Sequence, residues 1–216
     1  VWFCFLTAAY GLKSGSHIEV DVMTHSLRPR SKIMLQLAAL VLVLLYVTIF
    51  SYFGWQMVED SHRRDQVTPN LLHFPVWIIQ LGLGIGVTIL VLQTIRAIAK
   101  TISQLRRMPP EKSQYFPVIL FIISVISALI VLTEVSQIGG IVCVLAVLLL
   151  GGVPVFAALG LVGAAGFFFF FGGFDSLSQV AFMGYKSSGE FTLVALPLFI
   201  LAGSLLASGG IGEELF

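Results

Sequence analysis

The sequence predicts an all-α protein, a polytopic bundle of transmembrane helices in which about six to seven spans are visible, the first of them truncated. Hydrophobic residues make up 57% of the chain and charged residues 11%, whereas a globular domain carries about 25% charge. The mean hydropathy is +0.99. Nine of the twelve Lys and Arg residues lie in two short stretches, 13–32 and 96–112, that flank apolar runs. Nucleic-acid binding, which needs a continuous basic stripe, is therefore excluded.

The first half of the chain contains two complete spans and the end of an earlier one. Val1–Tyr10 is apolar from its first residue and is expected to be the tail of a span that is already under way. Ile33–Val58 and Phe74–Ile95 each supply the roughly 20 apolar residues that cross a bilayer. Pro75 stands near the first turn of the second span, where its missing N–H costs little.

The second half contains shorter apolar segments. Pro117–Thr133 is at the short limit for a span. Ile138–Phe171 carries no charge but would be about 50 Å long as a helix, too long for one upright span. Gly151–Pro154 (GGVP) interrupts it. We expect a hairpin of two short spans here, with one long kinked helix as the alternative. Phe191–Ala207 is the last expected span.

The basic stretches orient the spans, because positively charged loops stay in the cytoplasm. Both 13–32 and 96–112 are expected inside, and the two spans between them satisfy the parity. The loop Glu59–His73 has fewer positive charges and is expected outside. Continuing along the chain places a tight loop, Glu134–Ile138, and the segment Gly172–Glu190 outside as well.

The second basic stretch also marks a boundary. Arg96–Arg107 is typical of a basic helical extension, and Met108–Ser113 (MPPEKS) is typical of a linker. Before this boundary the spans contain Trp and Tyr and flank sizeable polar loops. After it Gly, Ala and Phe dominate, and small residues permit close helix packing in lipid. The sequence therefore predicts two parts of different character.

Ionisable side chains, which are functional candidates inside a membrane, are absent from the centre of every expected span. A proton relay or ion-coordinating centre is therefore not expected in these residues. The four histidines, His17, His25, His62 and His73, lie in loops or at their edges. A haem held between two of them is the weaker alternative to solvated interfacial histidines.

Three other features have two interpretations each. Arg63 and Arg64 form a charged cluster with their acidic neighbours on the outer face; it is either ordinary solvated loop charge or a docking point for an extracytoplasmic partner. Pro197 and Gly203 mark either a broken helix near a substrate site or a plain kinked scaffold helix. The GLGIG glycines at 82–86 lie mid-span and are expected to serve helix packing rather than phosphate binding.

The motifs resemble a known transporter family. Residues 8–21 (AAYGLKSGSHIEVD) resemble a motif of the small, Q-type membrane subunit of tripartite ATP-independent periplasmic (TRAP) transporters. Gly15, His17 and Asp21 occupy structural positions of that motif. The later Tyr-x-Gly-Trp and Pro-Val-Trp strings, at 52–55 and 75–77, also resemble this subunit.

The end of the chain resembles the start of the large, M-type subunit of the same family. The resemblance rests on residues 152–155 (GVPV) and on the longer string at 191–203 (FTLVALPLFILAG). Its structural motif residues in this sequence are Gly152, Pro154, Pro197 and Gly203. In this order on one chain, the motifs resemble a fused Q–M membrane component, present as a fragment.

The resemblance implies a division into three parts. Residues 1–107 would be the Q-type subunit without its first helix, 108–137 a linker with a connecting transmembrane helix, and 138–216 the N-terminal part of the M-type subunit. Since a Q-type subunit ends in the cytoplasm and an M-type subunit begins outside, the fusion needs one extra crossing. Pro117–Thr133 is expected to provide it.

The implied function is sodium-driven symport of an organic anion such as a dicarboxylate across the cell inner membrane. The implied partners are a periplasmic solute-binding protein, the remainder of the M-type subunit and the lipid bilayer. No enzymatic activity and no catalytic, cofactor or metal residue is expected, because the family's sodium and substrate sites would lie beyond this fragment. We accordingly expect residues 1–216 not to transport alone. The alternatives are a membrane anchor of a redox enzyme and a structural scaffold without transport activity.

Overall fold

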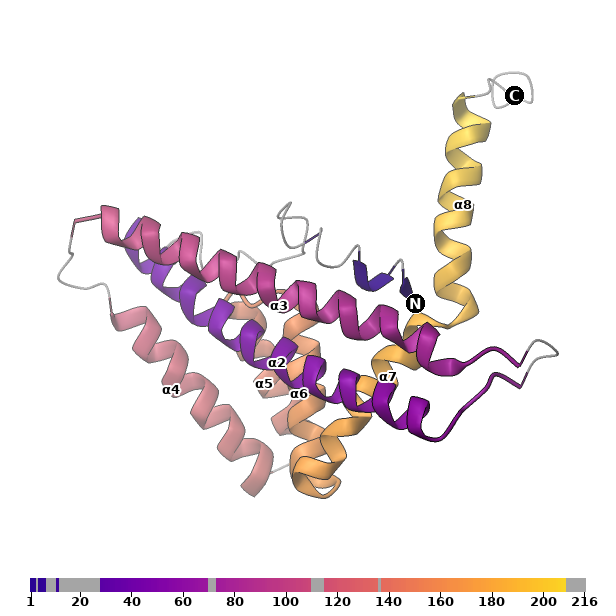
Figure 1. Ribbon diagram of the computed structural model, residues 1–216. Coiled ribbons are helices and arrows are strands. Elements are labelled where there is room, and N and C mark those ends of the chain that lie inside the picture. The colour runs from indigo at the N-terminus through magenta and orange to yellow at the C-terminus, as the bar shows by residue number, and fades with distance from the viewer. Residues whose placement is uncertain are drawn as a thin grey trace.

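The computed structural model describes residues 1–2, 4–6, 11, 28–69, 73–109, 115–135 and 137–208. The regular elements within these ranges are helices, which confirms the all-α prediction (Figure 1). The α-helices are α2 (Pro29–Arg63), α3 (Val76–Arg107), α4 (Phe116–Ile130), α5 (Gln137–Leu150), α6 (Val155–Phe170), α7 (Ser178–Ser188) and α8 (Phe191–Ser208). A π-helical turn, Val131–Val135, follows α4, and a 3₁₀ turn, Gly173–Leu177, precedes α7.

The two longest helices, α2 and α3, lie side by side and run in opposite directions (Figure 1). Proline stands where each begins: Pro29 is the first residue of α2, and Pro75 caps α3. Proline suits this place because the first N–H groups of a helix have no partner within it. Backbone hydrogen bonding joins the two ends of the connection between the helices: Thr68 N donates to Phe74 O at 2.8 Å.

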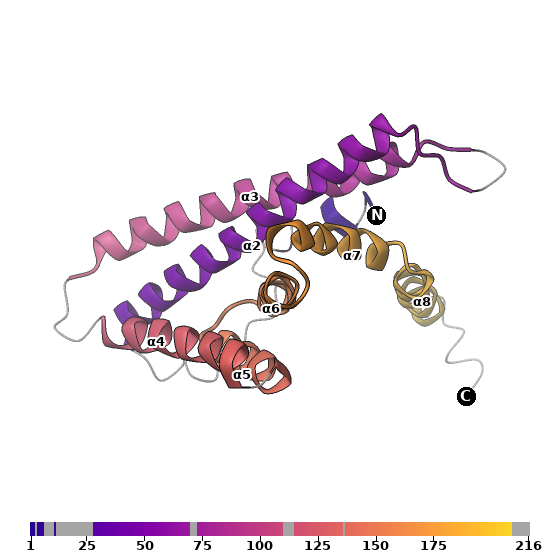
Figure 2. The ribbon, with the colours of Figure 1, turned by 90° about the horizontal axis from the view of Figure 1, so that it is seen from below.

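α2 lies between α3 and the later helices. It packs against α3 on one side and against α4, α6 and α7 on the other, so that α4 to α7 form a second layer over the α2–α3 pair (Figure 2). Hydrophobicity does not drive helices together inside lipid, and close packing has to do so. Small residues accept large ones across these interfaces: Gly54 faces Leu83 of α3, and Gly184 of α7 faces Phe50.

Among the residues that the structure describes, three segments are long and apolar enough to cross a membrane: Pro29–Arg63, Val76–Arg107 and Phe116–Thr133. At 35 residues, α2 is about 52 Å long and exceeds the roughly 30 Å hydrocarbon core. The shorter apolar helices α5 and α6 have 14 and 16 residues. A polytopic helical bundle is thus confirmed, while the remaining spans of the expected six to seven stay predictions.

The outer loop expected at Glu134–Ile138 is wrong for most of its length. Glu134 and Val135 belong to the π-helical turn, and α5 already begins at Gln137. Polar residues suggested a loop, but a helical backbone satisfies its own hydrogen bonds. The Thr133 hydroxyl also bonds back within the helix, donating to Leu129 O at 3.3 Å and Ile130 O at 3.2 Å.

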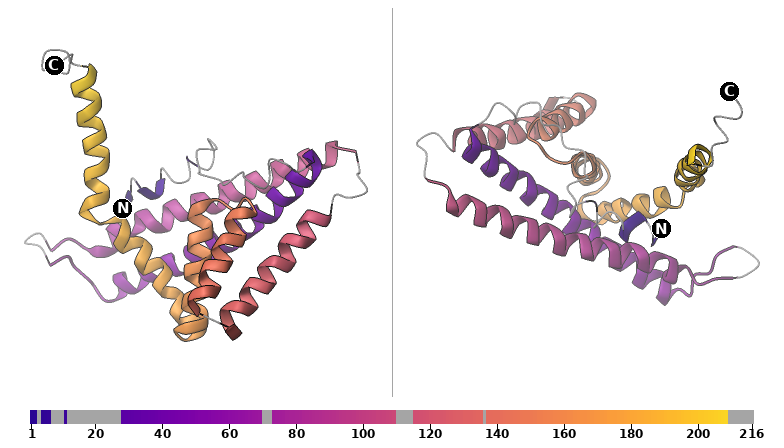
Figure 3. Two further views of the ribbon diagram at one scale, coloured as in Figure 1. Left: turned by 180° about the vertical axis from the view of Figure 1, so that it is seen from behind. Right: turned by 90° about the horizontal axis from the view of Figure 1, so that it is seen from above.

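The interruption at Gly151–Pro154 is a hairpin turn, so the kinked-helix alternative is wrong. α5 and α6 pack against each other and reverse direction at this point (Figure 3). Gly152 has φ +77°, a left-handed conformation that favours glycine. Val153 N donates to Leu148 O at 3.1 Å to close the turn, and Pro154 caps α6.

The segment expected outside between the last two spans is helical. After Phe171 the chain turns through Gly172 and Gly173, at φ +112° and +75°, into the 3₁₀ turn and then α7. The Ser176 hydroxyl donates to Phe167 O at 2.6 Å and fixes the turn on the end of α6. α7 therefore lies back along α2.

α8 extends away from the other helices (Figures 1 and 2). It is one unbroken helix through Pro197 and Gly203, so the broken-helix interpretation of these residues is wrong. Its described large side chains are strongly exposed, with Phe199 at 75% and Ile200 at 71%.

Candidate functional site

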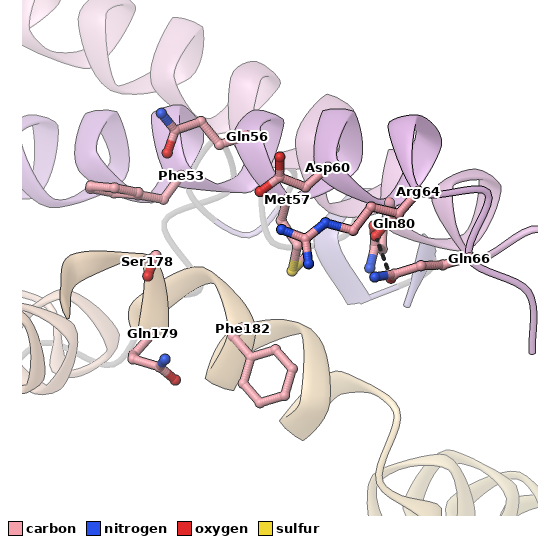
Figure 4. Close-up of a pocket in the computed structure, with 11 residues that line it drawn as sticks. Phe53, Gln56, Met57, Asp60, Arg64, Gln66, Gln80, Ser178, Gln179 and Phe182 are labelled. Atoms are coloured by element: carbon pink, nitrogen blue, oxygen red, sulfur yellow. Dashed lines mark hydrogen bonds between the residues drawn. The ribbon is translucent and has the colours of Figure 1, made fainter. Parts of the chain in front are cut away.

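A pocket of about 470 Å³ lies between the C-terminal end of α2, the start of α3 and α7 (Figure 4). It is the junction at which the turn after α2 meets the α7 segment, and the distribution of positive charges predicts that both lie outside. The pocket is therefore expected to open toward the extracytoplasmic face.

The α2 wall carries two opposite charges. Asp60 and Arg64 line the pocket and are four residues apart, which puts them one turn from each other at the helix end. Both residues are exposed. Within the part of the chain that the structure describes, neither side chain forms an ion pair. This wall therefore offers one cationic and one anionic contact to a ligand.

The α3 wall contributes a buried amide. Gln80 is only 5% exposed, and its Oε1 atom has no hydrogen-bond partner among the described residues. A buried acceptor without a donor costs free energy, and such groups are rare in folded proteins. Ser61, nearby on α2, is already paired, since its hydroxyl donates to Gln66 Oε1 at 3.1 Å. Gln80 is thus the acceptor that a ligand in the pocket would satisfy.

The α7 wall adds Ser178, Gln179 and Phe182. Phe182 is 48% exposed, and with Phe53 and Met57 of α2 it forms the apolar part of the lining. In Figure 4 the α7 residues lie opposite those of α2. The pocket is therefore amphipathic, with charged and amide groups on one side and aromatic and thioether groups beside them.

The structure separates the two arginines that the sequence singled out as a pair. Arg63 lies outside the pocket lining and forms an ion pair with Glu59 at 2.5 Å, the two side chains being 73% and 59% exposed. Arg64, by contrast, lines the pocket. Exposed pairs of this kind contribute little stability. Only Arg64 belongs to the candidate site.

The other residues predicted from motifs lie elsewhere or outside the described residues. Gly152 and Pro154 form the α5–α6 turn, and Pro197 and Gly203 lie in α8, which does not line the pocket. Gly15, His17 and Asp21 lie outside the described residues, as does His25. Of the remaining histidines, His62 contacts Trp77 edge-on at 5.2 Å, away from the pocket lining.

No group of three or more His, Cys, Asp or Glu side chains that could hold a metal occurs among the described residues. The pocket residues that the sequence analysis missed are Gln80 and those of α7. Gln80 is a strongly polar side chain inside an apolar run, and this was a usable signal. The α7 residues gave none, because only the packing of α7 on α2 brings them there.

Comparison with known families covers most of the chain. Residues 1–107 match the family described as tripartite ATP-independent periplasmic transporters, DctQ component. Residues 142–216 match the DctM component of the same transporters. The chain belongs to the TRAP transporter family. The resemblance noted from the motifs is thereby confirmed, and the two components follow one another on a single chain.

Membership of the TRAP family fixes the general class of the protein. Both matched components are parts of a transporter rather than an enzyme, and both are multi-pass proteins of the inner membrane.

The glycines of the GLGIG string contact bulky side chains, as packing requires: a Cβ atom on Gly84 would lie 3.3 Å from the Trp55 ring.

A curated relative matches part of this TRAP chain. It is the C4-dicarboxylate TRAP transporter small permease protein DctQ of Rhodobacter capsulatus, 27% identical over 86 residues, which is 40% of this chain. The match spans 37% of the relative's length. No solved structure matches the chain significantly.

Proposed function

We propose that the chain is part of the membrane component of a secondary transporter that imports an organic anion, a carboxylate, together with sodium. One observation carries the proposal: a DctQ match and a DctM match follow each other on the same chain. The name of the Rhodobacter capsulatus relative supports a C4-dicarboxylate as the first substrate to test. Substrate would be delivered by a periplasmic solute-binding protein.

The proposed division of labour follows the three-part division of the chain. Residues 1–107 would form the Q-type part, 108–137 the connection and 138–216 the start of the M-type part. The matched ranges, 1–107 and 142–216, support this division. In the structure α2 contacts α4, α6 and α7, so the Q-type part would act as a scaffold against which the M-type part is held.

Proteoliposomes that contain the transporter polypeptide carrying this sequence provide the test. With the binding protein outside and an inward sodium gradient, radiolabelled succinate should accumulate. Accumulation should stop when the gradient is collapsed or the binding protein is omitted. Uptake that persists without sodium would overturn the coupling, and uptake that persists without the binding protein would overturn the delivery.

The outer arginines provide a test of partner docking. Arg63→Glu and Arg64→Glu reverse the charge at the expected outer end of α2, and either should weaken binding of the solute-binding protein if the contact is electrostatic. Glu59→Gln is the matched control, because it frees Arg63 without removing a positive charge. Unchanged affinity in both arginine variants would remove them from the docking surface.

A further inference from the structure

The pocket between α2, α3 and α7 has a more specific chemistry than docking requires. Three of its side chains require different partners: the Asp60 carboxylate a cation, the Arg64 guanidinium an anion, and the buried Gln80 carbonyl a hydrogen-bond donor (Figure 4). A ligand that meets all three must carry a cation, an anion and an N–H or O–H donor. The inference from these demands does not depend on the transport function proposed above.

The two charges exclude simple ions as the preferred ligand. A dianion such as a dicarboxylate would be attracted by Arg64 but repelled by Asp60, four residues away on the same helix. A cation would be attracted by Asp60 but repelled by Arg64. A zwitterion places one charge against each side chain, so both interactions are favourable.

The buried acceptor decides the kind of cation. Gln80 Oε1 can only accept a hydrogen bond, and within the described residues no protein group donates one to it. A primary ammonium group has three N–H donors, enough for Gln80 and Asp60 together. A quaternary ammonium has none and would leave the Gln80 carbonyl unsatisfied.

We propose that this pocket binds a zwitterion in which a primary ammonium lies close to an oxyanion, as in an ethanolamine phosphate group. The ammonium would donate to Gln80, with the Asp60 carboxylate balancing its charge, and the phosphate would pair with Arg64. The lining also contains Phe53, Met57 and Phe182, which suit the apolar chains next to a phospholipid headgroup. The same group also occurs in soluble phosphate esters, and the test separates these two sources.

Native mass spectrometry of the delipidated transporter polypeptide measures binding directly. Phosphatidylethanolamine should bind about tenfold more tightly than phosphatidylcholine or phosphatidylglycerol with the same acyl chains. The preference should disappear in Asp60→Asn and Gln80→Leu, while Arg64→Gln should weaken phosphatidylethanolamine binding. Arg63→Gln is the matched control at the same helix end and should leave the preference intact, because Arg63 does not line the pocket.

Glycerophosphoethanolamine, which has the headgroup without acyl chains, separates the sources. Binding of this soluble ester as tight as that of the lipid identifies a solute site, and binding of the lipid alone identifies a bilayer ligand; either result upholds the proposal. Equal binding of the ethanolamine and choline lipids by the native protein overturns it. Gln80 is buried, so Gln80→Leu could disturb folding, but Asp60 is exposed and Asp60→Asn tests the site without that risk. An unaltered lipid preference in Asp60→Asn would also overturn the proposal.

Discussion

Trp55 Nε1 donates a hydrogen bond to Thr88 Oγ1 at 3.0 Å and so joins α2 to α3. The Thr88 hydroxyl in turn donates to Gly84 O at 2.7 Å, one turn earlier on its own helix. The Thr88 oxygen therefore accepts a hydrogen bond from α2, while the Thr88 hydroxyl hydrogen is donated within α3. A polar bond between helices helps to align them where both are surrounded by lipid.

Removing this bond should destabilise the α2–α3 pair. Trp55→Phe and Thr88→Val each remove one partner, and a double-mutant cycle should give a coupling of about 0.6–1.7 kcal/mol, as for other bonds between membrane helices. Reversible unfolding in bicelles or mixed micelles measures it. Tyr52→Phe is the control, because Tyr52 accepts its bond from Gln56 of the same helix. A coupling near zero would show that the Trp55–Thr88 bond does not hold the helices together.

Gly140→Ala should weaken the packing of α5 on the end of α4. A Cβ atom at this position would lie 2.6 Å from the backbone nitrogen of Leu132, which cannot move aside as a flexible side chain can. The expected loss is about 1–3 kcal/mol, measured by thermal unfolding in detergent. Gly163→Ala is the matched control on α6, where nothing lies within 4 Å, and its stability should be unchanged or higher. Equal stability of the two variants would contradict the close approach of α5 to Leu132.

The α5–α6 turn should depend on glycine at position 152. Its φ of +77° costs a residue with a side chain about 1–2 kcal/mol, and a β-branched residue suffers most. Gly152→Val should therefore lower the melting temperature more than Gly152→Asn, since Asn tolerates the left-handed region. Equal effects of the two substitutions would indicate that the backbone at this turn is not left-handed.

The topology can be tested by labelling single cysteines. After replacement of Cys4 and Cys143, cysteines at Gln66 and Ser187 should react with a membrane-impermeant maleimide added outside intact cells. A cysteine at Gln104, near the basic end of α3, should react only after permeabilisation. All three positions are exposed in the structure. Opposite labelling of Gln66 and Ser187 would contradict the α5–α6 hairpin.

Long apolar runs in the sequence correctly predicted helical elements. The α2 and α3 helices contain their predicted spans, because about 20 consecutive apolar residues without charge are typical of a transmembrane helix. The prediction was wrong at an outer segment. A loop was expected at Glu134–Ile138, but Glu134 and Val135 belong to a π-helical turn and α5 begins at Gln137, since helical turns satisfy their own backbone hydrogen bonds.

The candidate site could be predicted only in part. Arg63 and Arg64 were singled out together as a charged cluster on the expected outer face, yet only Arg64 lines the pocket. Arg63 is the last residue of α2 and pairs with Glu59, whereas Arg64 caps the helix; the packing of α3 and α7 around the helix end decides which of them lines the pocket. The α7 residues were missed because nothing in the local sequence indicates that α7 lies along α2.

The sequence by itself determined the membrane class and the resemblance to both TRAP components, because composition and motifs are local properties of the chain. The placement of the loops inside or outside stays a prediction from the positive charges. The tertiary structure decided that Gly151–Pro154 is a turn and that α2 packs against both α3 and the second layer of helices. It also brought Asp60, Arg64 and Gln80 to one pocket. These outcomes depend on contacts between distant segments, whose shapes must fit in lipid without a hydrophobic force to bring them together.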